Sequence, residues 1–367
     1  MNTLLTNKVI AREFARLLKS NIVYPMLVDK RFEADFNGKV GDTITIRKRN
    51  KLKPTDYNGV SVEKQDINES GIPVKLDRFK DLTIQISSKD RTLSLQDYSK
   101  QVLEPIAIGY AEQINQEIAA FIVGNAGTVV AKTDNPSDLK DIAKLSKALD
   151  IKKAPKTERS LVFSTEHVYD YLTTDILAKT SYAGTDSALR KAETGELFGM
   201  MTYQTQDNPT SDAASAGNIT AFKVTGVAGE SKVQITEANA ATATLKKGDK
   251  FIVGGHLYTI KQDVQCASNA ASNVQIEEKL HTTIETATSV VVVTKPTSVA
   301  FHKEAVAFVN VPLELPTAGV NAYVYNDETL SIRVTEQYDM NLKSDVISFD
   351  LLFGLAVVDK NLIVKLA

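Results

Sequence analysis

The chain has 367 residues, and this length predicts roughly two domains of about 150 residues each. Hydrophobic residues make up 43% of it and charged residues 24%, which is typical of a folded globular protein rather than a disordered one. The 43 basic and 45 acidic residues give a formal net charge of -2, so no long-range field attracts the chain to nucleic acid. The longest apolar run, Leu351 to Val358, is too short to cross a bilayer as a helix.

The N-terminal segment predicts an amphipathic helix that Pro25 should end, because proline lacks the backbone donor. Charged residues interrupt its apolar positions, so it does not have the pattern of a secretory signal, and we expect synthesis to end in the cytoplasm. One helical face carries Val9, Ile10, Phe14, Leu17, Leu18 and Ile22, and the other carries Lys8, Arg12 and Lys19.

Residues 38 to 88 follow a period of two and predict a long β-hairpin, with alternating segments at 43–47, 74–76 and 82–86. The tip, residues 47 to 73, is polar and contains Pro54 and the turn pair Asn58-Gly59. Because this tip has too few apolar residues to form a core of its own, it is expected to pack against another surface.

Between Leu95 and Val123 the apolar residues recur every four positions and predict a long helix that stops at Gly124-Asn125. Pro105 should either kink this helix or mark its first turn. We expect a helix at 137–149, a buried strand at 160–163 and a second helix at 165–177. A surface loop is expected at 180–197.

From Asp207 to about Pro296 the composition changes to short Val/Ile/Thr runs separated by Ala, Ser, Asn and Gly. This pattern predicts a small barrel or sandwich, entered through a linker at 211–217. Strands follow again at 305–311, 323–334 and 346–364. The sequence therefore predicts an α+β domain with an inserted β-module.

No motif for catalysis, cofactor binding or metal binding is present in the sequence. The four histidines lie in different predicted elements without metal-ligand spacing, and the phosphate-binding and nucleophile-elbow motifs are absent. Cys266 is the only cysteine and has no base near it in sequence. A pair of carboxylates brought together by the fold stays open, because the sequence cannot exclude it.

The order of these parts resembles the major capsid proteins of tailed bacteriophages, in particular the short-tailed-phage type with an insertion domain. The resemblance rests on the N-terminal block, the strand GDTITIRK at 41–48, the helix end YAEQINQEIAAFIVGN and the insert segment LKKGDKFIVGG. It implies the Hong Kong 97 type capsid fold, with an inserted β-barrel domain.

The resemblance also implies boundaries for each part of the fold. We expect an N-terminal arm at 1–37, an extended loop at 38–88, the spine helix of a peripheral domain at 89–135 and the first part of an axial domain at 136–210. The insertion domain would occupy 211–298, the axial domain would return at 299–320, and the peripheral strands would occupy 321–367.

The implied function is self-assembly, without catalysis and without a cofactor or metal. The expected partners are other copies in hexamers and pentamers, an external scaffolding protein, a portal protein and the enclosed double-stranded DNA, bound without sequence specificity. The expected location is the virion, assembled in the host cytoplasm, with no membrane contact. The alternatives are an encapsulin-type compartment shell and, in another class, a β-rich glycan-binding surface module.

Contact between subunits is the predicted role of the hairpin tip and of the N-terminal helix. The basic run in the tip has no interleaved aromatic residue for base stacking, which favours contact with protein or solvent over DNA. The candidate contact residues are Arg47, Lys48, Arg49, Lys51, Lys53, Glu63, Asp66, Glu69, Phe14 and Leu18.

Overall fold

The computed structural model divides into two compact units. The first contains Met1–Leu17, Val28–Pro105 and Val306–Val358, and the second contains Leu18–Leu27, Ile106–Ala305 and Asp359–Ala367. The structure describes residues 7–32, 43–47, 54, 56, 71–87, 102–132, 139–174, 195–209, 219, 221–239, 244–293, 296–317, 320–326, 330–341 and 343–366.

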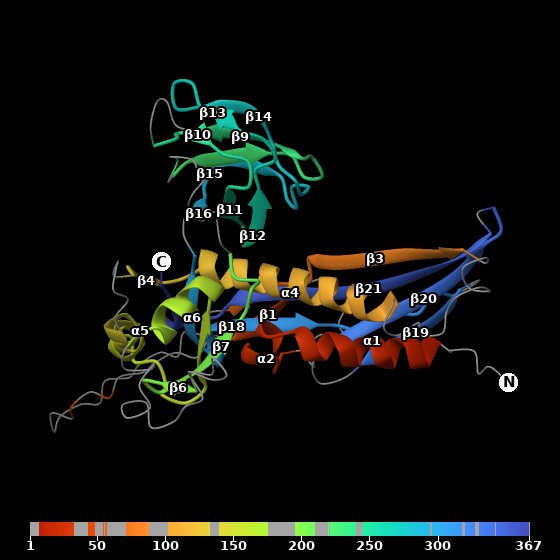
Figure 1. Ribbon diagram of the computed structural model, residues 1–367, viewed down its shortest axis with the longest axis horizontal. Helices are drawn as coiled ribbons and strands as arrows, with labels where there is room; N and C mark the ends of the chain where they lie inside the picture. The colour runs from red at the N-terminus through yellow and green to blue at the C-terminus, as the bar shows by residue number, and fades with distance from the viewer. Residues whose placement is uncertain are drawn as a thin grey trace. The chain divides into compact units, whose positions relative to one another are not determined.

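The first unit is built on an antiparallel sheet around one long strand, β21 (Figure 1). On one edge β21 pairs with β3, from Ser344↔Ser87 to Phe353↔Arg78. On its other edge it pairs first with β20 and then with β18, and β20 pairs with β19. The five described strands are β3 (Arg78–Ser87), β18 (Val306–Asn310), β19 (Asn321–Asn326), β20 (Ser331–Asp339) and β21 (Ser344–Val357).

Helix α1 (Asn7–Asn21) packs its apolar face against this sheet, as its periodicity predicts. Phe14 is fully buried, and its ring centroid lies 4.4 Å from that of Phe349 on β21. The prediction that Pro25 ends this helix was wrong. The helix ends at Asn21, and Pro25 is the second residue of a new short helix, α2 (Tyr24–Leu27), where its missing N–H removes no helical hydrogen bond.

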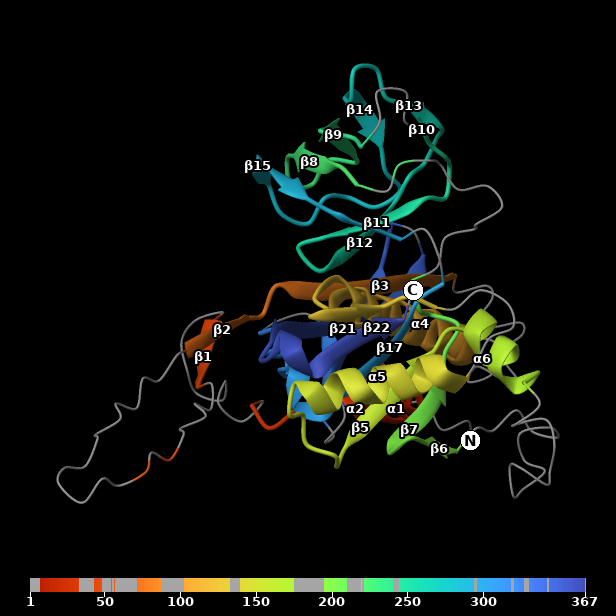
Figure 2. The ribbon, with the colours of Figure 1, turned by 90° about the vertical axis from the view of Figure 1, so that its left-hand side faces the viewer.

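The hairpin arms pair as predicted: β1 (Thr43–Arg47) and β2 (Gly71–Lys75) are antiparallel, with Thr43 opposite Lys75 and Arg47 opposite Gly71 (Figure 2). The third alternating segment behaves differently. It forms β3, which continues the chain after β2 but pairs with β21. Alternation alone could not separate the two roles, because an edge strand and a hairpin arm share the same period.

The second unit contains a mixed sheet with strand order β4-β22-β17-β5-β7-β6. Its strands are β4 (Thr128–Val130), β5 (Arg159–Phe163), β6 (Glu196–Leu197), β7 (Met200–Gln204), β17 (Ser298–His302) and β22 (Ile363–Leu366). The helices of this part are α4 (Glu104–Gly124), α5 (Leu139–Ile151) and α6 (Thr165–Leu172), with short 3-10 turns η3 (Lys303–Ala305) and η4 (Lys360–Leu362).

The helices agree with their predicted apolar stripes. In α4 the every-fourth-residue set Tyr110, Ile114, Ile118 and Ile122 is buried, and the helix stops at Gly124 as predicted. Pro105 lies in its first turn, where proline is tolerated. Ser164 caps α6 by accepting a hydrogen bond from the His167 N–H, but this helix ends at Leu172, five residues before its predicted end at Leu177.

The insert forms sheets of two, three and four described strands around a core of its own (Figure 1). Within the described residues these sheets do not join into a closed barrel, so the predicted barrel is not confirmed. Register shifts in two of the strand pairs interrupt continuous pairing. The strands are β8 (Lys223–Gly226), β9 (Lys232–Thr236), β10 (Thr244–Leu245), β11 (Lys250–Val253), β12 (His256–Thr259), β13 (Val264–Gln265), β14 (Ala271–Gln275), β15 (Ile284–Ser289) and β16 (Val291–Val293).

Candidate functional site

The predicted contact residues divide into two groups. Phe14 and Leu18 are fully buried within this chain, so each belongs to the chain's own core. Arg47 ends β1, and its side chain lies outside the described residues. The remaining candidates, Lys48, Arg49, Lys51, Lys53, Glu63, Asp66 and Glu69, also lie outside the described residues. Their contact role stays a prediction.

The base of the β1–β2 hairpin is anchored by apolar contacts. Ile44, Ile46 and Val74 are buried with Ala307 and Val309 of β18 and Ala356 of β21. Gly354 on β21 makes this approach possible, because a Cβ at that position would lie 2.3 Å from the Lys75 carbonyl oxygen. The described arms of the hairpin are therefore held by β18 and β21.

The insert rests on the end of α4. Ala120 and Val123 of the helix are buried with Ile252 and Val293 of the insert. Gly124 permits the contact, since a Cβ there would lie 2.9 Å from Ile252 Cγ2. The insert and α4 thus share an apolar contact.

A buried polar cluster surrounds the chain segments that lead into and out of the insert. The Asn115 carboxamide on α4 accepts from the Val23 and Tyr24 N–H groups, at 3.0 and 3.4 Å, and donates to Asp207 Oδ2 at 2.8 Å. Next to it, Asn208 accepts from the Tyr24 hydroxyl and donates to the Thr297 carbonyl oxygen, at 3.1 Å. Burial, and then the charge of Asp207, raise the pKa of Tyr24, so its hydroxyl keeps the donated proton.

Sequence reasoning missed this cluster. The one available signal was Asn115, a polar residue inside the apolar stripe of α4. Its partners lie 92 residues away in both directions, and no local pattern connects them. Because buried amides need partners, a polar residue in this stripe indicates a hydrogen-bonding centre inside the fold.

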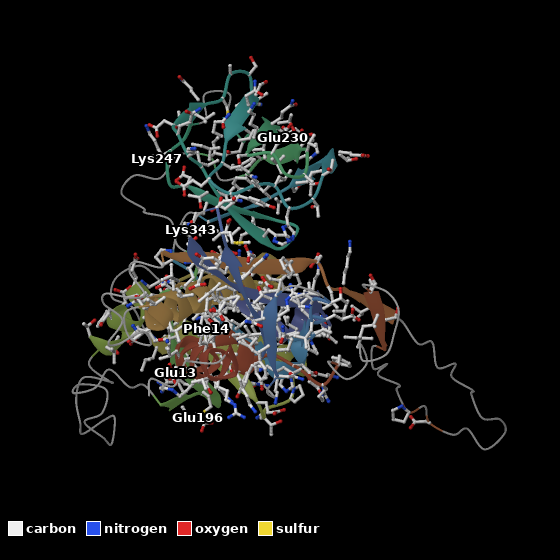
Figure 3. The ribbon with its side chains drawn as sticks, turned by 90° about the vertical axis from the view of Figure 1, so that its right-hand side faces the viewer. Glu13, Phe14, Glu196, Glu230, Lys247 and Lys343 are labelled. Atoms are coloured by element: carbon white, nitrogen blue, oxygen red, sulfur yellow. The ribbon has the colours of Figure 1, made fainter. Side chains whose placement is uncertain are left out.

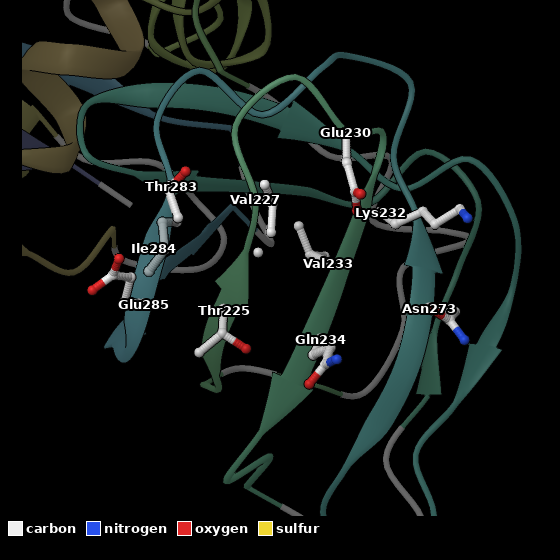
Figure 4. Close-up of a pocket in the computed structure, with 11 residues that line it drawn as sticks. Thr225, Val227, Glu230, Lys232, Val233, Gln234, Asn273, Thr283, Ile284 and Glu285 are labelled. Atoms are coloured by element: carbon white, nitrogen blue, oxygen red, sulfur yellow. The ribbon is translucent and has the colours of Figure 1, made fainter.

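A groove of mixed polar and apolar lining lies on the four-stranded sheet of the insert (Figure 4). Thr225 of β8 and Gln234 of β9 pair with each other in its lining. Both outer strands bulge beside them, β15 between Ile284 and Thr288 and β14 between Ala271 and Val274. The groove has a volume of about 410 Å³. Its lining mixes Lys232 with Glu230 and Glu285, so its charge selects no single class of ligand.

A serine and a histidine meet in the second unit, as they would in a nucleophilic enzyme. Ser298 Oγ lies 2.7 Å from His167 Nδ1 and accepts from the Ser164 N–H at 3.0 Å. Both side chains are buried, with 0% exposure at Ser298 and 3% at His167. A substrate could not reach this hydroxyl, so the contact joins β17 to the start of α6 rather than performing catalysis.

His167 should make stability depend on pH. Burial, and then the charge of Lys132, lower its pKa from 6.5 to about 4, although Asp170 opposes this. The unfolded chain binds the proton first, so the contribution is complete above pH 6.5 and is lost as the pH falls toward 4. We expect wild-type protein to lose about 3 kcal/mol over this range, and His167→Gln to lose clearly less, measured by chemical unfolding at each pH.

His281, which is exposed, provides the matched control for this experiment. His281→Gln should retain the wild-type dependence on pH. If the free energy of unfolding falls equally with pH in wild type and in His167→Gln, the buried imidazole is not the titrating group.

The structure also contains the carboxylate pair that the sequence left open. Asp81 of β3 lies opposite Asp350 of β21, and Ser348 Oγ lies 2.7 and 2.8 Å from one oxygen of each. Partial burial raises the pKa of Asp81, but hydrogen bonds from Ser348 and Thr83 outweigh it, so the pKa lies below its ordinary value. Arg333 binds Asp350 at 2.7 Å. Through Ser348 the two carboxylates link β3 to β21.

Two histidines that the sequence places apart come together in the insert, with the ring centroids of His256 and His281 4.2 Å apart. Within the described residues, no group of three or more His, Cys, Asp or Glu side chains is placed to hold a metal ion. Among the described helices, none has the length and apolarity needed to span a membrane.

No family model matches the chain, and no curated protein matches its sequence. Solved structures do match its fold. A structure from Mycobacterium phage Che8 has a TM-score of 0.54 and 16% identity, over 94% of this chain and 90% of that one. The capsid structure of the cyanophage P-SCSP1u has a TM-score of 0.54 and 12% identity, over 94% of this chain and 87% of that one. The chain therefore has an α+β fold seen in a phage capsid.

Proposed function

We propose that this chain is the major capsid protein of a tailed bacteriophage, a structural subunit of the icosahedral shell in the virion. The observation that carries the proposal is the shared fold with the cyanophage capsid structure along 94% of this chain. The likeness extends along most of the chain, whereas a β-rich binding module would be expected to match only one part of it.

The parts of the chain have separate roles in this proposal. We assign the Hong Kong 97 type arrangement, with residues 1–37 as the arm, 38–88 as the extended loop, 89–135 as the spine region and 211–298 as the insert. Residues 136–210 and 299–320 form the axial domain, and 321–367 complete the peripheral one. The anchored base of the hairpin supports this, because a loop that overlaps a neighbour needs a fixed origin.

The partners follow from the same role. We assign hexamers and pentamers of this chain, an external scaffolding protein, a portal protein and enclosed double-stranded DNA. Individually weak contacts add up in a closed shell, so no single surface needs high affinity. Chemistry has no part in this function, and the buried Ser298–His167 contact and the low pKa of Asp81 support that view.

Electron microscopy tests the proposal. Co-expression of the full chain with the scaffolding gene of the same phage is expected to give closed polyhedral particles, and expression without it should give irregular or incomplete ones. Soluble monomers with glycan affinity would contradict the proposal and favour a surface module. Particles filled with a cargo enzyme would contradict it in favour of a compartment shell.

A further inference from the structure

Helix α1 exposes a basic face. Lys8, Arg12, Arg16 and Lys19 are all exposed in the structure. At about 100° per residue they fall within an arc of about 80° and extend about 16 Å along the helix. The four cations therefore form one stripe, which we call the α1 basic face.

The orientation of this face is fixed by the opposite side of the helix. Ile10, Phe14 and Leu18 are buried at 5%, 0% and 0% exposure, and Phe14 packs on Phe349. Figure 3 labels Phe14 and its neighbour Glu13 on this helix. Rotating α1 would expose these side chains to water, at a cost of about 2 kcal/mol for each large one. The subunit therefore presents the basic face permanently.

Part of the charge of the face is compensated at Arg16, where the charges of Glu13 and Glu104 both act on the guanidinium. Glu13 is the single acidic residue of α1, and it binds Arg16 at 2.8 Å. Lys8 and Arg12 have no ion-pair partner among the residues that the structure describes. A concentrated positive stripe thus stands on a chain whose formal net charge is -2.

We infer that the α1 basic face contacts the phosphate backbone of double-stranded DNA. Recognition here must depend on charge, because Val9, 47% exposed, is the one large apolar side chain of α1 that is strongly exposed. A protein partner would need an apolar core in its interface, whereas DNA carries about one charge per 1.7 Å of its axis. The biological role of the contact rests on the proposed shell function, in which the enclosed DNA meets the wall without sequence readout.

The salt dependence of DNA binding tests the inference. A fluorescent duplex of arbitrary sequence is titrated with the unassembled full chain at several salt concentrations. Each phosphate contact contributes about 0.9 to the slope of log K against log salt, so Lys8→Gln, Arg12→Gln and Lys19→Gln together should reduce it by about 2.7. The affinity at low salt should fall by more than tenfold, equally for unrelated duplex sequences.

Two further proteins make the result specific. Lys140→Gln, Lys147→Gln and Lys152→Gln remove the same charge from exposed positions on and just after α5, and this control should bind DNA as wild type does. Lys8→Arg with Lys19→Arg should also retain binding. Unchanged DNA affinity in the α1 triple variant overturns the inference.

Poly-glutamate serves as the competing polyanion. If the triple variant loses poly-glutamate binding but keeps DNA binding, the face is a site for an acidic protein, and the inference is wrong. Particle formation is scored separately by microscopy. The triple variant should still form shells, and failure of wild type to form them would count against the proposed function rather than against this contact.

Discussion

Replacing Gly354 by alanine should detach the β1–β2 hairpin from its base and lower the free energy of unfolding by about 3 kcal/mol. The added Cβ would lie 2.3 Å from the Lys75 carbonyl oxygen and 3.0 Å from its carbonyl carbon. These are backbone atoms, which cannot rotate away as a side-chain end can, so β2 must shift. Thermal unfolding measures the loss, and electron microscopy should show that closed particles no longer form.

Gly109 provides the control for this substitution. It lies on the exposed side of α4, and a Cβ there would meet nothing within 4 Å. Gly109→Ala should stabilise the protein by about 0.5–1 kcal/mol, because alanine favours the helix. A Gly354→Ala protein as stable as wild type would mean that the hairpin base is not packed on β21 as described.

The second large effect is expected at Asn115. Asn115→Leu keeps the approximate size but removes the acceptor of the Val23 and Tyr24 N–H groups. Asp207 Oδ2 also loses the bond from Asn115 but keeps the one from the Thr205 hydroxyl. Each unsatisfied buried group costs about 1–3 kcal/mol, so we expect a loss of about 4 kcal/mol in total. Hydrogen exchange should show faster exchange of the Val23 and Tyr24 amides, a local readout that a general loss of packing would not single out.

The neighbouring Gln113 is exposed on the same helix. Gln113→Ala should change stability by less than about 0.5 kcal/mol and leave both amides protected. Equal protection of these amides in wild type and Asn115→Leu would show that Asn115 is not their principal acceptor.

Elements with a strong local period were predictable from the sequence. The stripe of α4, its stop at Gly124 and the buried strand β5 were confirmed, and so were several short strands of the insert. The local pattern did not identify the partners of each strand. β3 alternates like a hairpin arm but pairs with β21, more than 250 residues later in the chain. Pairing depends on long-range packing, which a single sequence does not record.

The functional surfaces were predicted less completely than the fold. The α1 apolar face was predicted, yet Phe14 and Leu18 proved to be core residues of their own subunit. An apolar stripe shows that a helix face is covered, but it does not show whether the cover is the same chain or another. The Asn115 cluster joins residues from four distant segments, and only Asn115, inside the apolar stripe of α4, gives a local signal.

The connection between β2 and β3 has a mechanical consequence. Only Leu76 and Asp77 separate the two strands, so a pull on the hairpin is transmitted along the axis of β3. The ladder between β3 and β21 contains ten residue pairs, whose hydrogen bonds run perpendicular to the strands. Force in this direction loads the pairs together in shear instead of unzipping them one by one. The subunit can therefore carry tension through its hairpin while the sheet behind it stays intact.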